Sequence, residues 1–400
     1  MSLRGRDLIT MADLSNAEIH LLMDTAAQMA EAIGFDDPAT RQTPAPLDRI
    51  MATCFFEPST RTRLSFESAM LRLGGSVLGF ADPKASSMTK QETLADTARV
   101  VSGYADVLVI RHPCAGAAKV AADAADIPVI NAGDGPHAHP TQTLADLFCI
   151  TRRFGRLDGL TVGLFGDLLY GRTVHSLGPV MARLSSRVIC ISPPELAMPR
   201  SYLVEMERLM GEPVRQVNDV NEVLGELDVL YVTRVQAERF PAPEQAQQSV
   251  GSYVVDTALL ARAPQGMIVM HPLPRVTEIN PEVDADPRAA YFEQARGGVP
   301  VRMAVVAHLL GLLEPERQGF HGFGGAARRR ETQPEPGRAR PEAEPEMIPA
   351  SAERRCRNQR CITREERFLA GYLQRRPDGV LQCPYCEEVV EEPQTEAQES

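Results

Sequence analysis

The chain has 400 residues, of which 44% are hydrophobic, and its formal net charge is −11 at pH 7. This length favours two to three domains, and the apolar content is ample for buried cores. The acidic balance argues against binding nucleic acid or a membrane through a basic face. The sequence has no apolar run long enough to span a bilayer and no charged-then-apolar leader, so we expect a cytoplasmic protein.

Strand-like apolar runs alternate with helical patterns along most of the chain. The first series has expected strands at 51–56, 76–80, 106–111 and 128–131, with helical patterns near 63–73, 92–102, 115–125 and 141–153. The second series has expected strands at 161–165, 187–191, 228–233 and 267–270. This alternation predicts an α/β protein with two doubly wound parallel-sheet domains of similar size.

The boundaries follow from the breaks between these patterns. The first domain is expected at 1–154 and the second at 155–282, and a helix over 283–313 is expected to complete the first domain. Residues 314–355 are rich in Gly, Pro, Glu and Arg and bury too little apolar surface to order themselves, so they are expected to be a flexible, disordered linker. A small module with four cysteines is expected after the linker, at 356–392.

Two pairs of cysteines define the small module. Cys356 and Cys361 form the first pair, and Cys383 and Cys386 form the second, which is the spacing of a four-thiolate structural zinc site. The module has too few large apolar residues to fold without such a metal site. We expect one structural Zn²⁺ per chain and no organic cofactor. A zinc ribbon that binds nucleic acid is the alternative, and the acidic residues after Cys386 argue against it.

The turn after the first expected strand has the composition of a phosphate site. Ser59, Thr60 and Thr62 offer hydroxyl donors, and Arg61 offers a planar guanidinium that matches phosphate oxygens. A helical pattern starts here, and the first N–H groups of a helix favour an anion. The run therefore predicts a phosphate site, and not simply an N-capped helix with a solvated arginine face.

Five runs, in order along the chain, resemble motifs of the aspartate and ornithine carbamoyltransferase family. They are the runs at 55–67, 139–144, 170–173, 233–236 and 271–275. The resemblance covers residues 5–313, and five motifs in order are far more specific than one. The last two runs favour the aspartate branch, because ornithine enzymes usually have a cysteine where this chain has Pro272.

The resemblance implies that the first domain binds carbamoyl phosphate and the second binds aspartate. His139 would polarise the carbamoyl carbonyl as a donor, and Gln142 would contact the carbamoyl group. The implied catalytic residues are Arg61, Thr62, Lys90, Arg111 and His139. The implied carbamoyl phosphate ligands are Ser59, Thr60, Arg61, Thr62, Ser86, Arg111, His139, Gln142, Leu273 and Pro274. The implied aspartate ligands are Lys90, Arg172, Arg234 and Gln236.

Ser86 and Lys90 resemble a loop that the family inserts from a neighbouring subunit. This loop departs from the family pattern, since Gln91 stands where a glycine is usual, and glutamine resists a turn with positive φ. Met88 and Thr89 also depart from it. These changes concern loop geometry and turnover rather than the fold.

Glu57 is expected to act outside the chemistry. The resemblance implies that it clamps the two domains through arginines, here Arg172 and Arg239. Such a clamp would favour a closed site that excludes water.

The implied reaction transfers the carbamoyl group to L-aspartate, as the second step of de novo pyrimidine (UMP) biosynthesis. The expected assembly is a homotrimer or a dimer of trimers, with a dihydroorotase or regulatory chain as a further partner. Two alternatives stay open: carbamoyl transfer to another amino acid such as ornithine, and a catalytically silent assembly subunit.

The runs at 356–362 and 383–387 resemble the zinc domain of the regulatory chain that partners some bacterial aspartate carbamoyltransferases. In that family the zinc domain grips the catalytic chain, and a separate domain binds nucleotides. No segment here corresponds to the nucleotide-binding domain. The resemblance therefore implies a structural or assembly role for the module, either in cis or between trimers.

Overall fold

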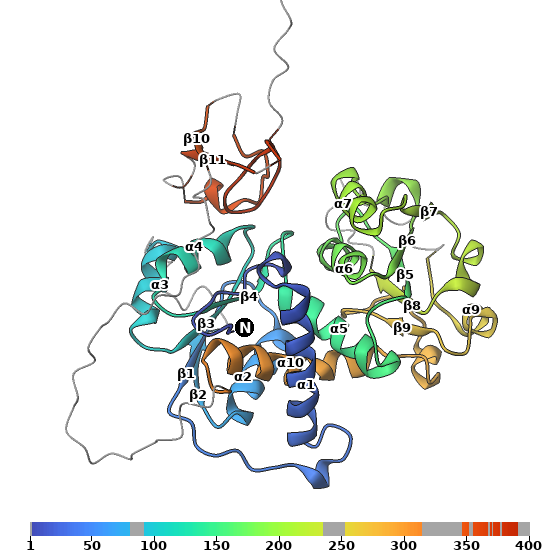
Figure 1. Cartoon of the computed structure of the whole chain (residues 1–400), viewed down its shortest axis with the longest axis horizontal. Helices are drawn as coiled ribbons and strands as arrows, with labels where there is room; N and C mark the ends of the chain where they lie inside the picture. Colours follow the sequence, from blue (N-terminus) through green and yellow to red (C-terminus); the bar gives the residue numbers. More distant parts are fainter. Residues whose placement is uncertain are drawn as a thin grey trace, which may run out of the picture. The chain divides into compact units, whose positions relative to one another are not determined.

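The computed structural model describes residues 2–80, 92–234, 253–313, 346–351, 355–366, 369, 371–376 and 378–390. The chain forms two compact units (Figure 1). The first unit comprises Met1–Ile9, Pro44–His137 and Val305–Ser400, and the second comprises Thr10–Thr43 and Ala138–Ala304. Among the described helices, none has the length and apolarity of a membrane span.

The first unit contains a four-stranded parallel sheet with strand order β2-β1-β3-β4. Its strands are β1 (Ile50–Phe55), β2 (Ser76–Phe80), β3 (Val107–His112) and β4 (Val129–Asp134). Helices connect them: α2 (Thr60–Arg72), α3 (Leu94–Ser102) and α4 (Ala117–Ala124). Strands β1, β3 and β4 are buried almost throughout, as expected for parallel strands covered on both faces.

The second unit contains a five-stranded parallel sheet with strand order β7-β6-β5-β8-β9. Its strands are β5 (Thr161–Gly166), β6 (Arg187–Ile191), β7 (Arg215–Val217), β8 (Val229–Thr233) and β9 (Ile268–Met270). Its helices are α1 (Asn16–Ala32), α5 (Pro140–Phe154), α6 (Arg172–Arg183), α7 (Arg200–Met210) and α9 (Thr257–Arg262). Helix α10 (Tyr291–Leu309) begins in the second unit and ends in the first.

A third, antiparallel sheet belongs to the C-terminal cysteine module, which we define as the described residues between 346 and 390. Its strands are β10 (Met347–Pro349), β11 (Tyr372–Arg375) and β12 (Leu381–Gln382). The sheet has a very small apolar core of Leu373, Leu381 and Val390. A module with so little buried apolar surface depends on another source of stability.

The predicted fold class is confirmed: two parallel-sheet α/β domains and a small module with a cysteine cluster. Helix α1 and the short strand β7 were not expected from the sequence. The helix expected over 283–313 starts only at Tyr291, because Pro287 lies in a turn where Asp286 accepts a hydrogen bond from the backbone N–H of Arg288.

The compact units divide the chain differently from the expected domains. Residues 10–43 and helix α5 belong to the second unit, although the sequence placed them in a first domain at 1–154. Strand β10 lies within the segment expected to be a linker, because Met347 and its neighbours pair with β11. Residues 314–345 and 352–354 of that linker lie outside the described residues. The functional domain boundaries stay a prediction.

Candidate functional site

The start of helix α2 lies at the carboxyl end of β1, in the first unit. Ser59 is the N-cap residue, and its side chain makes no capping hydrogen bond. Thr60, Arg61 and Thr62 form the first turn, where backbone N–H groups lack intrahelical acceptors. Ligands collect beyond the carboxyl ends of strands in such sheets. This turn therefore has the position and the donors of an anion site.

Arg111 lies beside this turn because β3 pairs with β1. It is opposite Phe55 in the sheet, and its backbone carbonyl accepts a hydrogen bond from the N–H of Phe56. Partial burial and then the charge of Arg111 lower the pKa of Arg61, so the two guanidiniums lie within electrostatic reach. The structure thus places Arg111 within electrostatic reach of Arg61, in the turn that also contains Ser59, Thr60 and Thr62.

The Arg111 guanidinium already has two protein partners. Its Nη1 donates to the carbonyl of Ala132 at 3.1 Å, and its Nη2 forms an ion pair with Glu57 Oε2 at 2.7 Å. The side chain of Arg111 is only 11% exposed, whereas that of Glu57 is 35% exposed. Glu57 was expected to pair with Arg172 and Arg239. Among the described residues of its own unit, Glu57 forms an ion pair with Arg111. Arg239 lies outside the described residues.

The second unit presents its candidates at the carboxyl ends of β5, β8 and β9. Gly166 at the end of β5 is opposite Thr233 at the end of β8, and Arg234 follows Thr233 directly. Arg172 is the first residue of α6, the helix that follows β5. Two of the four predicted aspartate ligands, Arg172 and Arg234, therefore follow adjacent strands at one edge of the sheet.

Leu273 and Pro274 follow β9, which pairs with β8. The bond between them is cis, and Leu273 has φ +53°. The buried His271 supports this turn: its Nδ1 accepts from the backbone N–H of Leu273 at 2.7 Å, and its Nε2 contacts Glu278 Oε1 at 2.8 Å. Burial alone would raise the pKa of the Glu278 carboxyl. The hydrogen bonds from His271 and from backbone N–H groups outweigh burial, so the net effect is a lowered pKa.

His139 is the N-cap residue of α5 and is 6% exposed. Gln142, one turn later, donates from Nε2 to Asp146 Oδ1 at 2.8 Å. No role was predicted for Asp146, yet its side chain is fully buried within the second unit. A carboxyl amid the apolar run from Leu144 to Phe148 is the signal that could have identified it.

Three predicted ligands lie outside the described residues. They are Ser86, Lys90 and Gln236, and the departures at Met88, Thr89 and Gln91 lie there too. Their roles stay predictions.

The four cysteines predicted to bind metal converge in the cysteine module. The sulfur atoms of Cys356, Cys361, Cys383 and Cys386 all lie within 4.8 Å of one another, with Cys356–Cys386 at 3.5 Å and Cys361–Cys383 at 3.8 Å. Tetrahedral zinc with Zn–S bonds of about 2.3 Å separates its sulfurs by about 3.8 Å. Hydrogen bonds among the four thiols lower the pKa of Cys361 and Cys383 and raise the pKa of Cys356 and Cys386, as expected when close thiols share protons. The donor set therefore suits a thiolate-bound metal ion.

The remaining four cysteines, Cys54, Cys114, Cys149 and Cys190, are buried thiols. Burial raises the pKa of Cys54, Cys114 and Cys190 to about 12 and that of Cys149 even further. They are therefore uncharged at neutral pH.

The cysteine module contacts the rest of the first unit through backbone hydrogen bonds. Ala115 donates from its N–H to the carbonyl of Arg360 at 2.8 Å and accepts from the N–H of Ile362 at 2.9 Å. Glu366 Oε1 accepts from the N–H of Leu94 at 2.6 Å, at the start of α3. Ile362 is 1% exposed and joins the apolar core that covers the β1–β4 sheet. The module is thus docked in cis, on the loop that follows β3.

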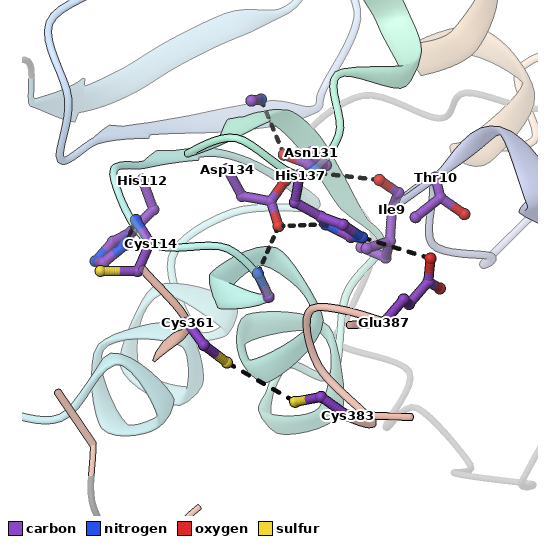
Figure 2. Close-up of polar contacts among 12 residues, drawn as sticks. Ile9, Thr10, His112, Cys114, Asn131, Asp134, His137, Cys361, Cys383 and Glu387 are labelled. Carbon is purple, nitrogen blue, oxygen red and sulfur yellow. Dashed lines mark hydrogen bonds and ion pairs between the residues drawn. The ribbon is translucent and has the colours of Figure 1, made fainter. Parts of the chain in front are cut away.

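A polar contact adds to this docking (Figure 2). Asp134, at the end of β4, accepts from the N–H of Gly116 at 2.8 Å and contacts His137 Nδ1 at 2.9 Å. His137 Nε2 reaches Glu387 Oε2 of the module at 3.4 Å. Gly116 has φ +85°, and a Cβ there would lie 2.6 Å from the backbone of Tyr385. This glycine therefore permits a close approach of the module that other residues would prevent.

The chain matches the models of three protein families. Residues 6–152 match the family described as "Aspartate/ornithine carbamoyltransferase, carbamoyl-P binding domain", and residues 158–309 match the "Aspartate/ornithine carbamoyltransferase, Asp/Orn binding domain". Residues 354–396 match the "Aspartate carbamoyltransferase regulatory chain, metal binding domain". The third match overlaps the cysteine module and includes all four of its cysteines.

Similar proteins agree with these matches. The aspartate carbamoyltransferase catalytic subunit of Thermococcus onnurineus is 51% identical over 314 residues, covering 78% of this chain and 100% of that protein. Among solved structures, an aspartate transcarbamoylase from Trypanosoma cruzi in complex with N-(phosphonacetyl)-L-aspartic acid is 42% identical with a TM-score of 0.72, covering 77% of this chain and 97% of that one. The catalytic subunit of M. jannaschii aspartate transcarbamoylase is 44% identical with a TM-score of 0.71, covering 78% and 100%.

Proposed function

We propose that this chain, which belongs to the aspartate/ornithine carbamoyltransferase family, transfers the carbamoyl group of carbamoyl phosphate to L-aspartate, giving N-carbamoyl-L-aspartate and phosphate. The observation that carries the proposal is a pair of arginines within electrostatic reach of each other: Arg61 at the start of α2 and Arg111 on the neighbouring strand β3. Both belong to the unit that contains most of the carbamoyl-P match. Relatives named aspartate carbamoyltransferase catalytic subunit match the chain through both units and support aspartate as the acceptor.

The reaction needs no covalent enzyme intermediate. The aspartate amino nitrogen bonds to the carbamoyl carbon, the bond from that carbon to the phosphate oxygen breaks, and phosphate leaves with the electron pair while the amine loses a proton. Catalysis then consists of positioning the two anions and stabilising charge on the carbonyl and the leaving group.

The residues divide this work by chemistry. Arg61 and the hydroxyl and N–H donors of the α2 start hold the phosphate, and Arg111 stabilises the charge that develops on it. His139 donates to the carbamoyl carbonyl, and Gln142 holds the carbamoyl amide group. Arg172 and Arg234 hold the aspartate carboxylates, because guanidinium is the side chain that best matches them.

An amino acid panel tests the proposal. The purified chain is mixed with carbamoyl phosphate and, separately, L-aspartate or L-ornithine, and the products are identified by mass. We expect N-carbamoyl-L-aspartate and no citrulline. Citrulline formation would favour the ornithine branch, and a folded chain that carbamoylates neither amino acid would favour a silent assembly subunit.

We propose that the cysteine module holds one Zn²⁺ per chain, because four thiolates at tetrahedral spacing favour this ion. Its role is structural, supported by its contacts with Ala115 and Leu94. Removing residues 340–400 tests this role: unchanged assembly mass and unchanged kinetics would refute it.

The remaining parts of the proposal follow from the family. The reaction is the second step of de novo pyrimidine biosynthesis and takes place in the cytoplasm. The chain assembles as a homotrimer or a dimer of trimers, in which the loop with Ser86 and Lys90 completes the site of a neighbouring subunit. Solution mass measurement separates these assemblies.

A further inference from the structure

Asp146 is a buried acid that the chemistry above leaves without a role. It is 0% exposed, and its neighbours Leu144, Leu147 and Phe148 are buried as well. A carboxylate in such surroundings is costly unless hydrogen bonds compensate for lost water. Its partners therefore indicate what it does.

Three side chains donate to Asp146. Its Oδ1 accepts from Gln142 Nε2 at 2.8 Å and from Gln294 Nε2 at 2.7 Å, and its Oδ2 accepts from the hydroxyl of Tyr231 at 2.9 Å. All lie within the second unit. A carboxylate accepts only, so all three partners must present their donor ends to it.

Each donor either belongs to a segment with predicted substrate ligands or hydrogen-bonds to one. Gln142 is itself one, and Tyr231 lies in β8, three residues before Arg234. Gln294 accepts at Oε1 from the backbone N–H of His271 at 2.9 Å, and His271 in turn supports the turn at Leu273. One carboxylate thus joins the start of α5 to the ends of β8 and β9.

The orientation of the Gln142 amide follows from this arrangement. Because Nε2 donates inward to Asp146, the oxygen Oε1 remains as the acceptor end of the amide. The carbamoyl group carries an NH₂ donor, which matches that oxygen. We infer that Asp146 is a positioning residue for the carbamoyl group, acting through Gln142; the inference rests on the proposed function.

Burial and hydrogen bonding have opposite effects on the pKa of Asp146, so the loss of one hydrogen-bond donor would change its protonation. Burial raises the pKa of Asp146 to about 7, while hydrogen bonds from Gln294, Gln142 and Tyr231 and the charge of the buried Arg302 oppose the increase. Cys149, uncharged, also lies within its electrostatic reach. Removing a donor would therefore favour the protonated acid, which no longer offers two acceptor oxygens.

Calorimetric binding of two ligands to the full chain tests the inference. Carbamoyl phosphate has the amide group, whereas inorganic phosphate does not. In Asp146→Asn, we expect Kd for carbamoyl phosphate to rise about tenfold, since one oriented hydrogen bond is lost, and Kd for phosphate to change less than twofold. Combined with Gln142→Ala, the same substitution should add less than twofold, because its effect passes through Gln142.

The control is Asp228→Asn at the opposite edge of the same sheet. Asp228 Oδ2 accepts from the N–H of Thr161 at 2.8 Å, so this variant removes a structural carboxylate remote from the network. It should lower the melting temperature and leave both Kd values unchanged. Equal weakening of both ligands in Asp146→Asn, or no weakening, would overturn the inference.

A second variant covers the case in which Asp146→Asn does not fold. Tyr231→Phe removes one donor from Asp146 and keeps the ring. At the pH of the wild-type measurement, it should raise Kd for carbamoyl phosphate at least twofold relative to phosphate, and an unchanged ratio overturns the inference. A wild-type chain that binds carbamoyl phosphate but carbamoylates no amino acid refutes the proposed function alone.

Discussion

Replacing Gly116 with alanine is expected to release the cysteine module from the loop after β3. A Cβ at this position would lie 2.6 Å from the backbone carbon of Tyr385 and 2.8 Å from its oxygen. Carbon atoms pack at about 3.5–4.0 Å, so the two backbones must separate by about 1 Å. Backbone atoms cannot rotate away as a flexible side chain can, so the whole contact must yield.

The size of the effect follows from the bonds that this separation breaks. The hydrogen bonds of Ala115 with Arg360 and Ile362 measure 2.8 and 2.9 Å, and stretching them by about 1 Å ends them. Each is worth about 1 kcal/mol, and the burial of Ile362 adds about 2 kcal/mol. Losing about 4 kcal/mol corresponds to a nearly thousandfold increase in opening.

Hydrogen exchange measured by mass spectrometry, in peptides covering 113–120 and 358–366, is the assay. The matched control is Gly211→Ala: Gly211 has φ +75°, close to the +85° of Gly116, but nothing lies within 4 Å of its Cβ position. Both variants incur the cost of positive φ, about 1–2 kcal/mol, but only Gly116→Ala should accelerate exchange in these peptides. Equal exchange in the two variants would refute the reasoning.

Three further predictions concern charge and metal. Glu57→Gln should strengthen inorganic phosphate binding several-fold at low salt, because phosphate no longer competes with Glu57 for Arg111; unchanged or weaker binding in calorimetry contradicts this. A chelator should release one metal ion per chain, measured by a colorimetric metal indicator, and unfold the cysteine module; a module that keeps its exchange protection without metal contradicts it. Glu278→Gln should lower the free energy of unfolding by about 1–3 kcal/mol at pH 7, because the buried His271 loses a charged partner. The folded pKa of Glu278 is lowered, so its contribution to stability is fully present above the ordinary glutamate pKa and is lost as pH falls through the lowered folded pKa. Denaturant unfolding should therefore show a smaller loss in Glu278→Gln at pH 3 than at pH 7, and equal losses would contradict the reasoning.

The sequence predicts the strands well where they are continuous apolar runs. The runs at 51–56 and 161–165 correspond to β1 (Ile50–Phe55) and β5 (Thr161–Gly166), because strands buried on both faces leave a clear signal. Strand β7 (Arg215–Val217) was missed, since it is short, partly exposed and at the sheet edge. Its pairing with β6 is a tertiary effect that local pattern does not contain.

The candidate site is predictable where ligands follow strands directly. Arg111 and Arg234 were predicted from the family resemblance, and in the structure they lie at the carboxyl ends of β3 and β8, where parallel sheets gather ligands. Asp146 was not found, since its partner Tyr231 is 85 residues away and Gln294 is 148 residues away. The close approach at Gly116 was missed for the same reason: Tyr385 is distant in sequence and adjacent only in the fold.

Turnover by Arg61→Gln tests the central claim most directly, because this change removes a guanidinium from the start of α2 and keeps a side chain of similar length. Conversion of ¹³C-labelled carbamoyl phosphate in the presence of L-aspartate is followed by NMR for the wild-type chain and the variant. We predict a ¹³C signal of N-carbamoyl-L-aspartate for the wild type and at least a hundredfold slower appearance for the variant, since charge-assisted contacts to phosphate are lost. A folded variant that forms the product at the wild-type rate would contradict the account.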